Sequence, residues 1–377
     1  MSGPLRPALL HPTYWPEVRR GAERLVHDVA AGLAARGHEP WILTSHDGPA
    51  ERTLDGRITI VRHRRPPDAL LGRRALQDHL THLPLVWRTL RREGFDVVHA
   101  FHPSDALLAV RSRRPAVLTL VGLPRPEALA NRWLRLETLE RAMSGCDELV
   151  TISAAAQAAA QRWLGRGGRV IHPGTDLTVF RRRAERDDGG GPIVFCPSAL
   201  DDARKRGDLL LAGFARVREQ RPGARLMLSR PRDPALAAAL EAPGVELVDV
   251  DAEDELARAY SAASVTVLAS QAEAFGLVLV ESLACGTPVV ASSDGAGPEI
   301  IDRPGIGALF EAPEPDALAA ALLEAIDLRD PAAACRGRAE ELSLERCAEE
   351  HEALYRELLA RYRALTARQP RAQQSRP

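Results

Sequence analysis

Lysine is almost absent from this chain. Its 377 residues include 50 lysines and arginines in total, and Lys205 is the only lysine among them. An ammonium group is a compact point charge whereas a guanidinium is a planar fork, so the one position that keeps a lysine is a candidate for a site that needs it. Aromatic residues are scarce at 4%, and no basic stretch is interleaved with them, which gives no support for nucleic-acid binding.

Cysteine and long apolar runs are also scarce. The five cysteines form no CxxC pair and leave an odd count, which fits reduced thiols in a protein core better than a disulfide framework. No apolar run approaches the roughly 18–20 residues that a membrane-spanning helix needs, and the first residues do not resemble a signal segment. We therefore expect a cytoplasmic protein whose membrane contact, if it has one, is peripheral and at the inner face.

Short apolar runs alternate with helical stretches along the chain, a pattern typical of parallel sheets covered by helices. In the first half the predicted strands are residues 7–11, 40–44, 58–62, 96–100, 116–120, 148–152 and 169–172. In the second half they are residues 193–197, 225–228, 245–248, 265–268 and 288–291. We predict an α/β protein with two Rossmann-like domains facing each other across a cleft.

The predicted boundaries follow from composition. The first domain covers residues 1–180 and the second residues 190–343, separated by a polar, glycine-rich linker without apolar periodicity. A final helix at about 344–364 is predicted to pack back on the first domain. The polar tail at 366–377 is predicted to be disordered.

The strongest local signal is a pair of glutamates, Glu273 and Glu281, around the start of an apolar helix. Glu273 follows a predicted strand, at the sheet edge where open α/β folds bind ligands. The first amides of the helix, from Phe275, Gly276 and Leu277, have no intrahelical acceptors and suit a diphosphate. We therefore predict a nucleotide-sugar site; the alternative is that Glu273 caps the helix and Glu281 is a solvated charge.

This segment resembles the Glu-x7-Glu region of the family-four retaining glycosyltransferases (glycosyl transferases group 1), which have the GT-B fold. The likeness covers nearly the whole chain. Further matching segments, in the expected order, are residues 21–24, 95–100, 150–153, 172–176, 205–211 and 286–290, followed by Pro298 and Glu299. Each segment is weak by itself, but the ordered set is specific.

The resemblance implies transfer of a sugar, with retention, from a nucleotide diphosphate sugar to an acceptor that is a sugar, a lipid or a small molecule. It implies that Lys205 contacts the donor diphosphate, Glu281 the ribose and Glu273 the transferred sugar. Gly21 would let the backbone of the first domain approach the phosphates. The donor is a co-substrate, and we expect no other cofactor and no metal ion, because lysine and a helix dipole neutralise the leaving group.

Three positions depart from the family pattern. Arg20 stands where a second glycine is usual, and Val121 replaces a histidine on the acceptor side. Ala199 stands where an arginine usually accompanies the lysine, so Arg204 or Arg206 has to supply that charge.

Other residues were weighed for the site. His102 is the better candidate to replace the lost acceptor-side histidine, whereas His99 is expected to be a core histidine. Glu23 and Ser153 are open between cleft residues and helix-cap or surface roles. Asp249-Val-Asp251 resembles a metal-binding motif but is expected to cap the next helix.

Two further interpretations stay open. The basic amphipathic helix predicted at 69–92 either covers the sheet or docks at a membrane bearing a lipid acceptor. The chain as a whole could instead be a non-catalytic nucleotide-sugar-binding or regulatory protein on the same fold, or a sugar epimerase or phosphorylase. A nicotinamide oxidoreductase is disfavoured because no GxGxxG follows the first strand.

Overall fold

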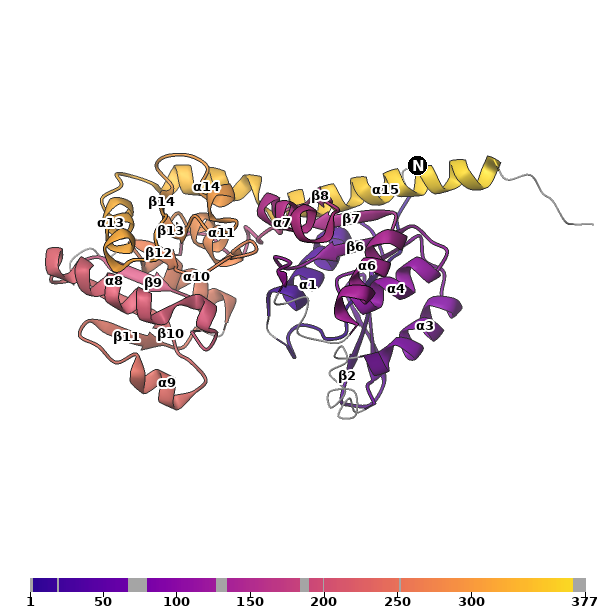
Figure 1. The fold of residues 1–377 in the computed structure, drawn as a ribbon, viewed down its shortest axis with the longest axis horizontal. Coiled ribbons are helices and arrows are strands. Elements are labelled where there is room, and N and C mark those ends of the chain that lie inside the picture. Colours follow the sequence, from indigo (N-terminus) through magenta and orange to yellow (C-terminus); the bar gives the residue numbers. More distant parts are fainter. Residues whose placement is uncertain are drawn as a thin grey trace, which may run out of the picture. The chain divides into compact units, whose positions relative to one another are not determined.

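The computed structural model describes residues 3–18, 20–66, 80–126, 134–183, 190–198, 200–250 and 252–368. Its contacts divide the chain into two compact units, each built around one sheet (Figure 1). Unit 1 comprises residues 1–152, 156–171 and 347–377, and unit 2 comprises residues 153–155 and 172–346. That the two units face each other across a cleft stays a prediction.

The junction between the units differs from the predicted one. The N-terminal part of unit 1 ends at residue 171 rather than 180, because the following segment is bonded to unit 2. The Thr175 amide donates to the Leu342 carbonyl at 3.1 Å, and the Phe180 ring packs against Tyr260 with centroids 6.1 Å apart.

Unit 1 contains an eight-stranded sheet in the order β3-β4-β2-β1-β5-β6-β7-β8. Every described pairing is parallel except β3 with β4, which is antiparallel. The strands are β1 Pro7–Leu10, β2 Trp41–His46, β3 Glu51–Asp55, β4 Ile58–Arg64, β5 Val97–Ala100, β6 Ala116–Leu120, β7 Glu148–Thr151 and β8 Arg169–Val170. Strand β3 was not predicted, because all five of its residues are exposed and its sequence has no apolar alternation.

The helices of unit 1 cover both faces of this sheet. Within the described residues they are α1 Gly21–Ala35, the short η1 Leu80–His82, α3 Leu83–Arg92, α4 Pro103–Arg111, α6 Arg135–Gly145, α7 Ala154–Leu164 and the greater part of α15 Leu344–Arg368. Helix α15 runs to Arg368, so the start of the predicted disordered tail is helical. The rest of that tail lies outside the described residues.

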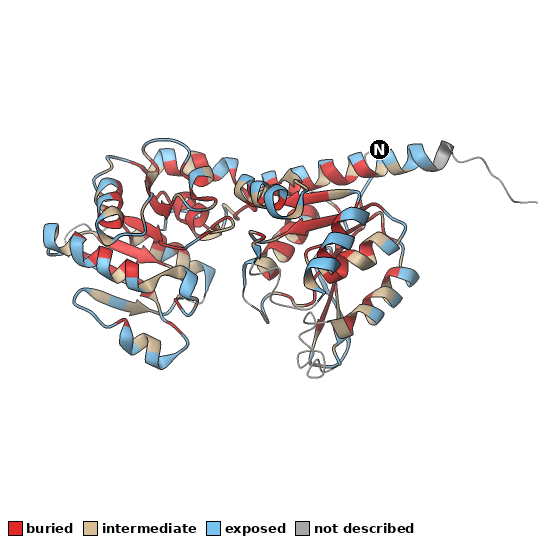
Figure 2. Cartoon of the chain, viewed as in Figure 1, coloured by how far each residue is buried: buried red, intermediate tan, exposed pale blue. Residues whose placement is uncertain are grey.

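Helix α15 contributes to the core of unit 1. Ala348, Leu354, Tyr355 and Leu358 on this helix are buried, and buried and exposed residues alternate along it (Figure 2). His99 on β5 is fully buried and is hydrogen-bonded to Tyr355 Oη at 2.7 Å and to Thr119 Oγ1 at 2.6 Å. His99 is therefore a core histidine, as expected.

Unit 2 contains a six-stranded, fully parallel sheet in the order β11-β10-β9-β12-β13-β14. The strands are β9 Ile193–Cys196, β10 Arg225–Ser229, β11 Val245–Val248, β12 Val265–Leu268, β13 Val289–Ser292 and β14 Gly307–Phe310. The helical elements are η3 Ala203–Lys205, α8 Gly207–Gln220, α9 Pro234–Ala239, α10 Glu253–Ala262, α11 Leu277–Ala284, α12 Gly297–Ile300, α13 Pro315–Ile326 and α14 Ala332–Glu341. Apolar side chains of the strands pack with those of α8 and α13 to form its core.

The five cysteines, Cys146, Cys196, Cys285, Cys335 and Cys347, are all free thiols and all buried. They fill the cores, as the sequence predicts. Burial raises the pKa of the Cys196 thiol to about 11, so it stays protonated near neutral pH. Within the described part of the chain, no helix has both the length and the apolar character needed to cross a bilayer.

Candidate functional site

The carboxyl ends of β9 and β12 mark the centre of unit 2. These two strands are neighbours, but the chain leaves them in opposite directions: β9 leads through α8 to β10, and β12 leads through α11 to β13. Such a topological switch point opens a crevice at the carboxyl edge, and open α/β sheets bind their ligands there. Lys205 follows β9 and Glu273 follows β12, so both lie at this point.

Lys205 and Glu273 are in direct contact. Lys205 Nζ donates to Glu273 Oε2 at 2.8 Å, and the two side chains are 22% and 25% exposed. An ion pair that is this accessible can exchange partners with an arriving anion at modest cost, because neither charge is sealed from water. The structure thus brings together two of the predicted residues that lie 68 positions apart.

The backbone around Glu273 is fixed by a turn that follows β13. The Ala296 amide donates to the Glu273 carbonyl at 3.0 Å, and Asp294 Oδ2 accepts from the Ala272 amide at 3.1 Å. Gly295 has φ +114°, and a Cβ built there would lie 2.4 Å from the Glu273 carbonyl oxygen. Asp294 and Gly295 were missed by the sequence analysis, although an Asp-Gly pair shortly after a strand is a turn signal.

Both arginines beside Lys205 are already engaged. Arg204 is paired with Asp202, which raises the pKa of the guanidinium. Arg206 donates to the carbonyls of Ala269 and Ser270 at 2.6 and 2.9 Å, and burial lowers its pKa. Arg206 therefore fastens the loop that leads to Glu273, a role that the sequence analysis did not foresee.

The amino end of α11 lies next to Glu273 in the chain. Gly276 takes the left-handed conformation, with φ +99°, and Leu277 begins the helix. The Phe275 ring is buried and stacks on His172 with centroids 5.5 Å apart, so only the backbone of Phe275 is available to a ligand. The positive end of the helix dipole favours an anion at this position.

Glu281 differs from the other residues that are predicted to bind the nucleotide-sugar donor. Its side chain is buried, with 1% of the residue exposed, and Tyr260 Oη donates to Glu281 Oε2 at 2.8 Å. The solvated-charge alternative is therefore wrong, because this carboxylate lies in the interior between α10 and α11. The predicted contact with a ribose stays a prediction, and Tyr260 is a partner that the sequence did not reveal.

Unit 1 places its candidate residues at the carboxyl ends of β1 and β5. His102 precedes α4, and its Nδ1 lies 2.7 Å from Ser104 Oγ. Glu23 on the first turn of α1 is buried and accepts from Thr13 Oγ1 at 2.7 Å, so its surface interpretation is wrong. Gly21 begins α1, and a Cβ there would meet nothing within 4 Å; packing does not explain this glycine.

The structure settles one further prediction, and others concern residues that lie outside its described ranges. Asp249 pairs with Arg230 at 2.9 Å and does not cap α10, whose Ala252 amide donates to Glu255 Oε2 instead. Asp251 and Ala199 lie outside the described residues, as does the first part of the predicted 69–92 helix. Across the described ranges, no cluster of three or more His, Cys, Asp or Glu side chains is arranged to hold a metal ion.

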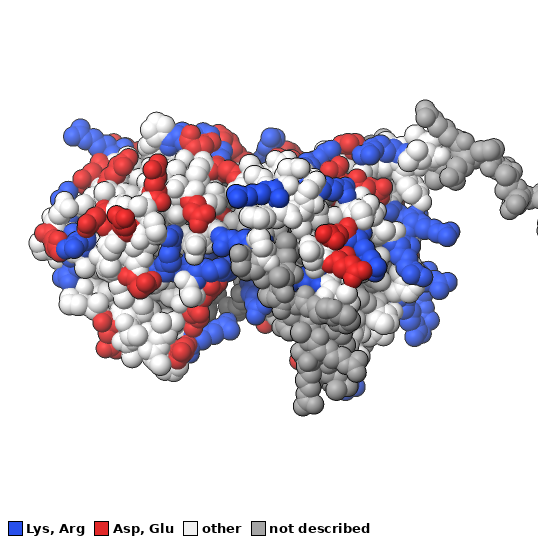
Figure 3. Space-filling model, in the orientation of Figure 1, with Lys and Arg blue, Asp and Glu red and all other residues white. Residues whose placement is uncertain are grey.

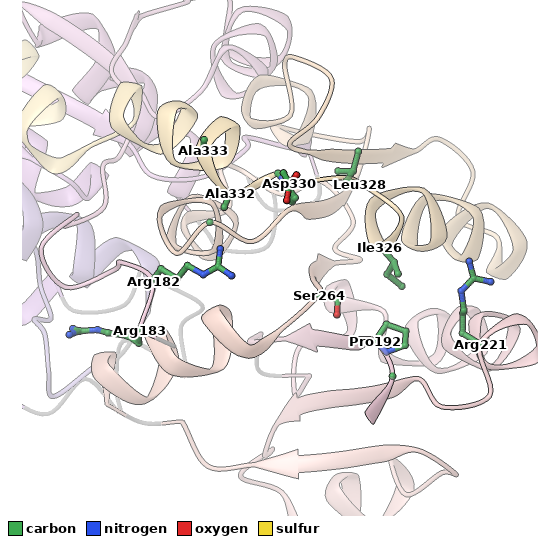
Figure 4. Close-up of a pocket in the computed structure, with 13 residues that line it drawn as sticks. Arg182, Arg183, Pro192, Arg221, Ser264, Ile326, Leu328, Asp330, Ala332 and Ala333 are labelled. Atoms are coloured by element: carbon green, nitrogen blue, oxygen red, sulfur yellow. The ribbon is translucent and has the colours of Figure 1, made fainter. Parts of the chain in front are cut away.

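A hollow of about 1190 Å³ lies in unit 2, and Figure 4 shows the side chains that line it. Pro192 and Ser264, which line it, directly precede β9 and β12, so it lies at the amino edge of the sheet. Two of its arginines are paired, Arg183 with Asp254 and Arg221 with Asp327. None of the predicted site residues lines it.

Comparisons with known families agree with this arrangement. The family model described as Glycosyltransferase Family 4 matches residues 19–179, and the model described as Glycosyl transferases group 1 matches residues 191–327. The two matches lie in the two halves of the chain and together cover most of it. The chain belongs to the group 1, family-four glycosyltransferases.

Individual relatives support the family and the fold. A D-inositol 3-phosphate glycosyltransferase of Streptomyces avermitilis is 31% identical over 282 residues, which is 67% of this chain and 57% of that protein. The sucrose-phosphate synthase of Thermosynechococcus elongatus has a TM-score of 0.78 at 23% identity, covering 95% of this chain and 100% of that one. HepE of Anabaena, solved in complex with UDP and glucose, has a TM-score of 0.72 at 18% identity, covering 94% and 100%.

The fold is thus GT-B, with two Rossmann-like units. The sequence match spans less than two thirds of the inositol phosphate enzyme from Streptomyces.

Proposed function

We propose that this protein is a retaining glycosyltransferase that moves a sugar from a nucleotide diphosphate sugar onto an acceptor hydroxyl. The observation that carries the proposal is the Lys205–Glu273 ion pair at the switch point of unit 2, beside the amino end of α11. Family membership and the UDP in the HepE structure support a nucleotide-sugar donor, and they make UDP conjugates the first donors to test.

The chemistry follows from these charges. A diphosphate at the amino end of α11 takes Lys205 as a partner, which frees Glu273 to accept hydrogen bonds from hydroxyls of the donor sugar. As the bond between the anomeric carbon and the phosphate oxygen breaks, negative charge grows on the diphosphate, and Lys205 and the helix dipole stabilise it. The acceptor oxygen then bonds to the anomeric carbon on the same face, and the departing phosphate takes the acceptor proton.

One observation favours a second candidate, a nucleotide-sugar-binding protein without turnover. Because Arg204 and Arg206 are held by Asp202 and by backbone carbonyls, Lys205 is the cation best placed to neutralise the leaving group. A catalyst with one such charge is expected to be slow, and a pure binder would not turn over at all. Epimerase and phosphorylase activities would give a changed donor sugar or a sugar phosphate instead of a glycoside.

The test compares the full-length wild type with Lys205→Ala, using Lys205→Arg as the matched charge-conserving control. Incubation with UDP-sugars and an acceptor panel, followed by mass spectrometry, is expected to give a glycoside and UDP with the wild type only. Because Arg cannot reproduce a compact ammonium, Lys205→Arg is expected to recover little activity. Donor binding without any product would favour the non-catalytic candidate, and an isomerised donor or sugar phosphate would favour the other two.

The surface of unit 1 supports a further part of this proposal, a peripheral contact with anionic lipid. Basic side chains gather over α3 and α4 (Figure 3). The exposed ones on these helices are Arg88, Arg91, Arg92 and Arg111, which form no ion pair within the described residues. With the reduced cysteines, they support a cytoplasmic protein at the inner face of the membrane. Sedimentation with vesicles that contain phosphatidylserine, compared with neutral vesicles, tests this contact.

A further inference from the structure

Glu299 lies on the short helix α12 of unit 2 and binds the first amides of another helix. Its Oε2 accepts from the Ala154 amide at 2.7 Å, and its Oε1 accepts from the Ala155 amide at 2.8 Å. These two residues begin α7 and belong to unit 2 together with Glu299. Because the first amides of a helix have no intrahelical acceptor, a carboxylate from a distant part of the chain caps α7 with charge-assisted bonds.

The same carboxylate also orients a histidine. The Nε2 atom of His172 lies 3.1 Å from Glu299 Oε2. Burial by itself raises the pKa of the Glu299 carboxyl, but the hydrogen bonds from His172 and from the two amides outweigh it, so the pKa lies below its ordinary value. Glu299 is therefore ionised near neutral pH and has no proton to donate, which makes His172 Nε2 the donor. This bond fixes the orientation of the imidazole ring.

The oriented ring packs against the start of α11. It stacks on the Phe275 ring with centroids 5.5 Å apart and 25° between the planes. Phe275 is 3% exposed and directly precedes Gly276 and Leu277, and the amides of these three residues are predicted to bind the diphosphate. A stacked pair adds to what apolar burial alone contributes. The Glu299 carboxylate is thus connected, through His172, to the backbone of the predicted diphosphate site.

The backbone of Glu299 is anchored independently of its side chain. Arg338 on α14 is 8% exposed and donates to the carbonyls of Glu299 and Ile300, at 2.5 and 3.2 Å. Position 299 is therefore expected to keep its place when the carboxylate is removed. Substitutions can then separate two roles, the cap on α7 and the support of Phe275, because the cap uses the carboxylate and the support also needs the imidazole.

We infer that Glu299 and His172 are a positioning pair for the diphosphate of the sugar donor. Glu299 orients the imidazole, the imidazole supports Phe275, and the amides at the amino end of α11 are thereby held in the arrangement that binds a diphosphate. Both side chains act through Phe275 rather than by touching the donor. The inference rests on the proposed function, since it concerns the diphosphate site of the same reaction.

The pair is expected to act on the phosphates and not on the nucleoside. The backbone that it supports is the part of unit 2 predicted to bind the diphosphate, whereas the ribose contact is predicted for Glu281. Loss of the pair should therefore weaken the binding of a nucleoside diphosphate and leave the binding of the corresponding nucleoside unchanged. A general loss of structure in unit 2 would weaken both.

The experiment measures binding to the full chain. UDP, GDP and ADP are titrated into the wild type by calorimetry, and the one that binds most tightly is compared with its nucleoside, which is followed by ligand-observed NMR. The variants are His172→Ala, Glu299→Ala and, as the matched control, Glu324→Ala, which replaces an exposed glutamate of α13. We expect the first two to bind the nucleoside diphosphate roughly 3- to 10-fold more weakly, the usual effect of a stacked pair, and the control to bind it like the wild type.

The double variant distinguishes positioning from helix capping. Because Glu299 acts on the donor through His172, Glu299→Ala is expected to add little to the loss of affinity in a His172→Ala background. Glu299→Ala should nevertheless lower the unfolding midpoint in either background, since it removes the cap from α7. In the transfer assay, both single variants should raise KM for the donor and leave KM for the acceptor near the wild-type value.

Three results would overturn the inference: wild-type affinity of both single variants for the nucleoside diphosphate, an equal loss of affinity for the nucleoside, or fully additive losses in the double variant. A folded wild type that binds none of the three nucleoside diphosphates would instead contradict the proposed function, and the inference would fall with it.

Discussion

Helix α15 is predicted to make unit 1 sensitive to acid through His351. This histidine is 2% exposed, and its Nδ1 lies 2.8 Å from the Cys347 carbonyl one turn earlier. That bond leaves Nε2 buried without a hydrogen-bond partner within the described structure. Burial, only partly offset by the bond to Cys347, lowers the pKa of His351 to about 4.

The size of the effect follows from linkage. An unfolded histidine has a pKa of about 6.5, so between the two values the unfolded chain binds more protons, and stability is lost as the pH falls through this window. For one such group the loss is about 2 kcal/mol between about pH 8 and about pH 5, and about 3 kcal/mol near pH 4. Burial and the neighbouring His351 also hold the pKa of His99 well below its ordinary value, so His99 adds a loss of the same sign.

Unfolding by guanidinium chloride at the two pH values measures this loss. We expect His351→Leu to lose about 2 kcal/mol less than the wild type on acidification, because leucine fills the site without titrating. His46→Leu, at a more exposed site outside the contact with α15, is the matched control and should follow the wild type. Equal acid losses in the wild type and His351→Leu would refute the reasoning.

Two further predictions concern unit 2. Tyr260→Phe removes the donor to the buried Glu281 carboxylate and should lower the free energy of unfolding by about 1.5–3 kcal/mol; urea unfolding checks it, and an unchanged midpoint would contradict it. Gly295→Ala forces a left-handed φ and a backbone clash with Glu273, so we expect a loss of roughly 2–4 kcal/mol together with weaker donor binding. Calorimetric titration with UDP separates the two effects, and wild-type stability would show that the clash relaxes freely.

Much of the fold could be predicted from the sequence because buried parallel strands are short apolar runs between helices. β6 and β12 are found within the predicted residues. β3 could not be predicted, since its exposed polar residues carry no periodic signal and its pairing depends on β4. β14 was not predicted either, because it begins with glycine, a residue that is depleted in strands.

The site shows the same division. Lys205 and Glu273 could be nominated from their rarity and position, and their contact follows from the switch point. Two other contacts could not be predicted from the sequence: the hydrogen bond between Tyr260 and the buried Glu281, and the Asp105–His82 pair. Each contact joins side chains from different elements, and their spacing in the chain carries no signal.

The most direct test of the donor-site assignment is the thermal stabilisation of the protein by UDP, GDP, ADP and their sugar conjugates. The wild type is compared with Lys205→Ala and Glu281→Ala. The account predicts that one nucleotide class raises the melting temperature of the wild type and that both variants lose this shift. A folded wild type that no nucleotide stabilises, or a shift that survives Lys205→Ala unchanged, would contradict the assignment.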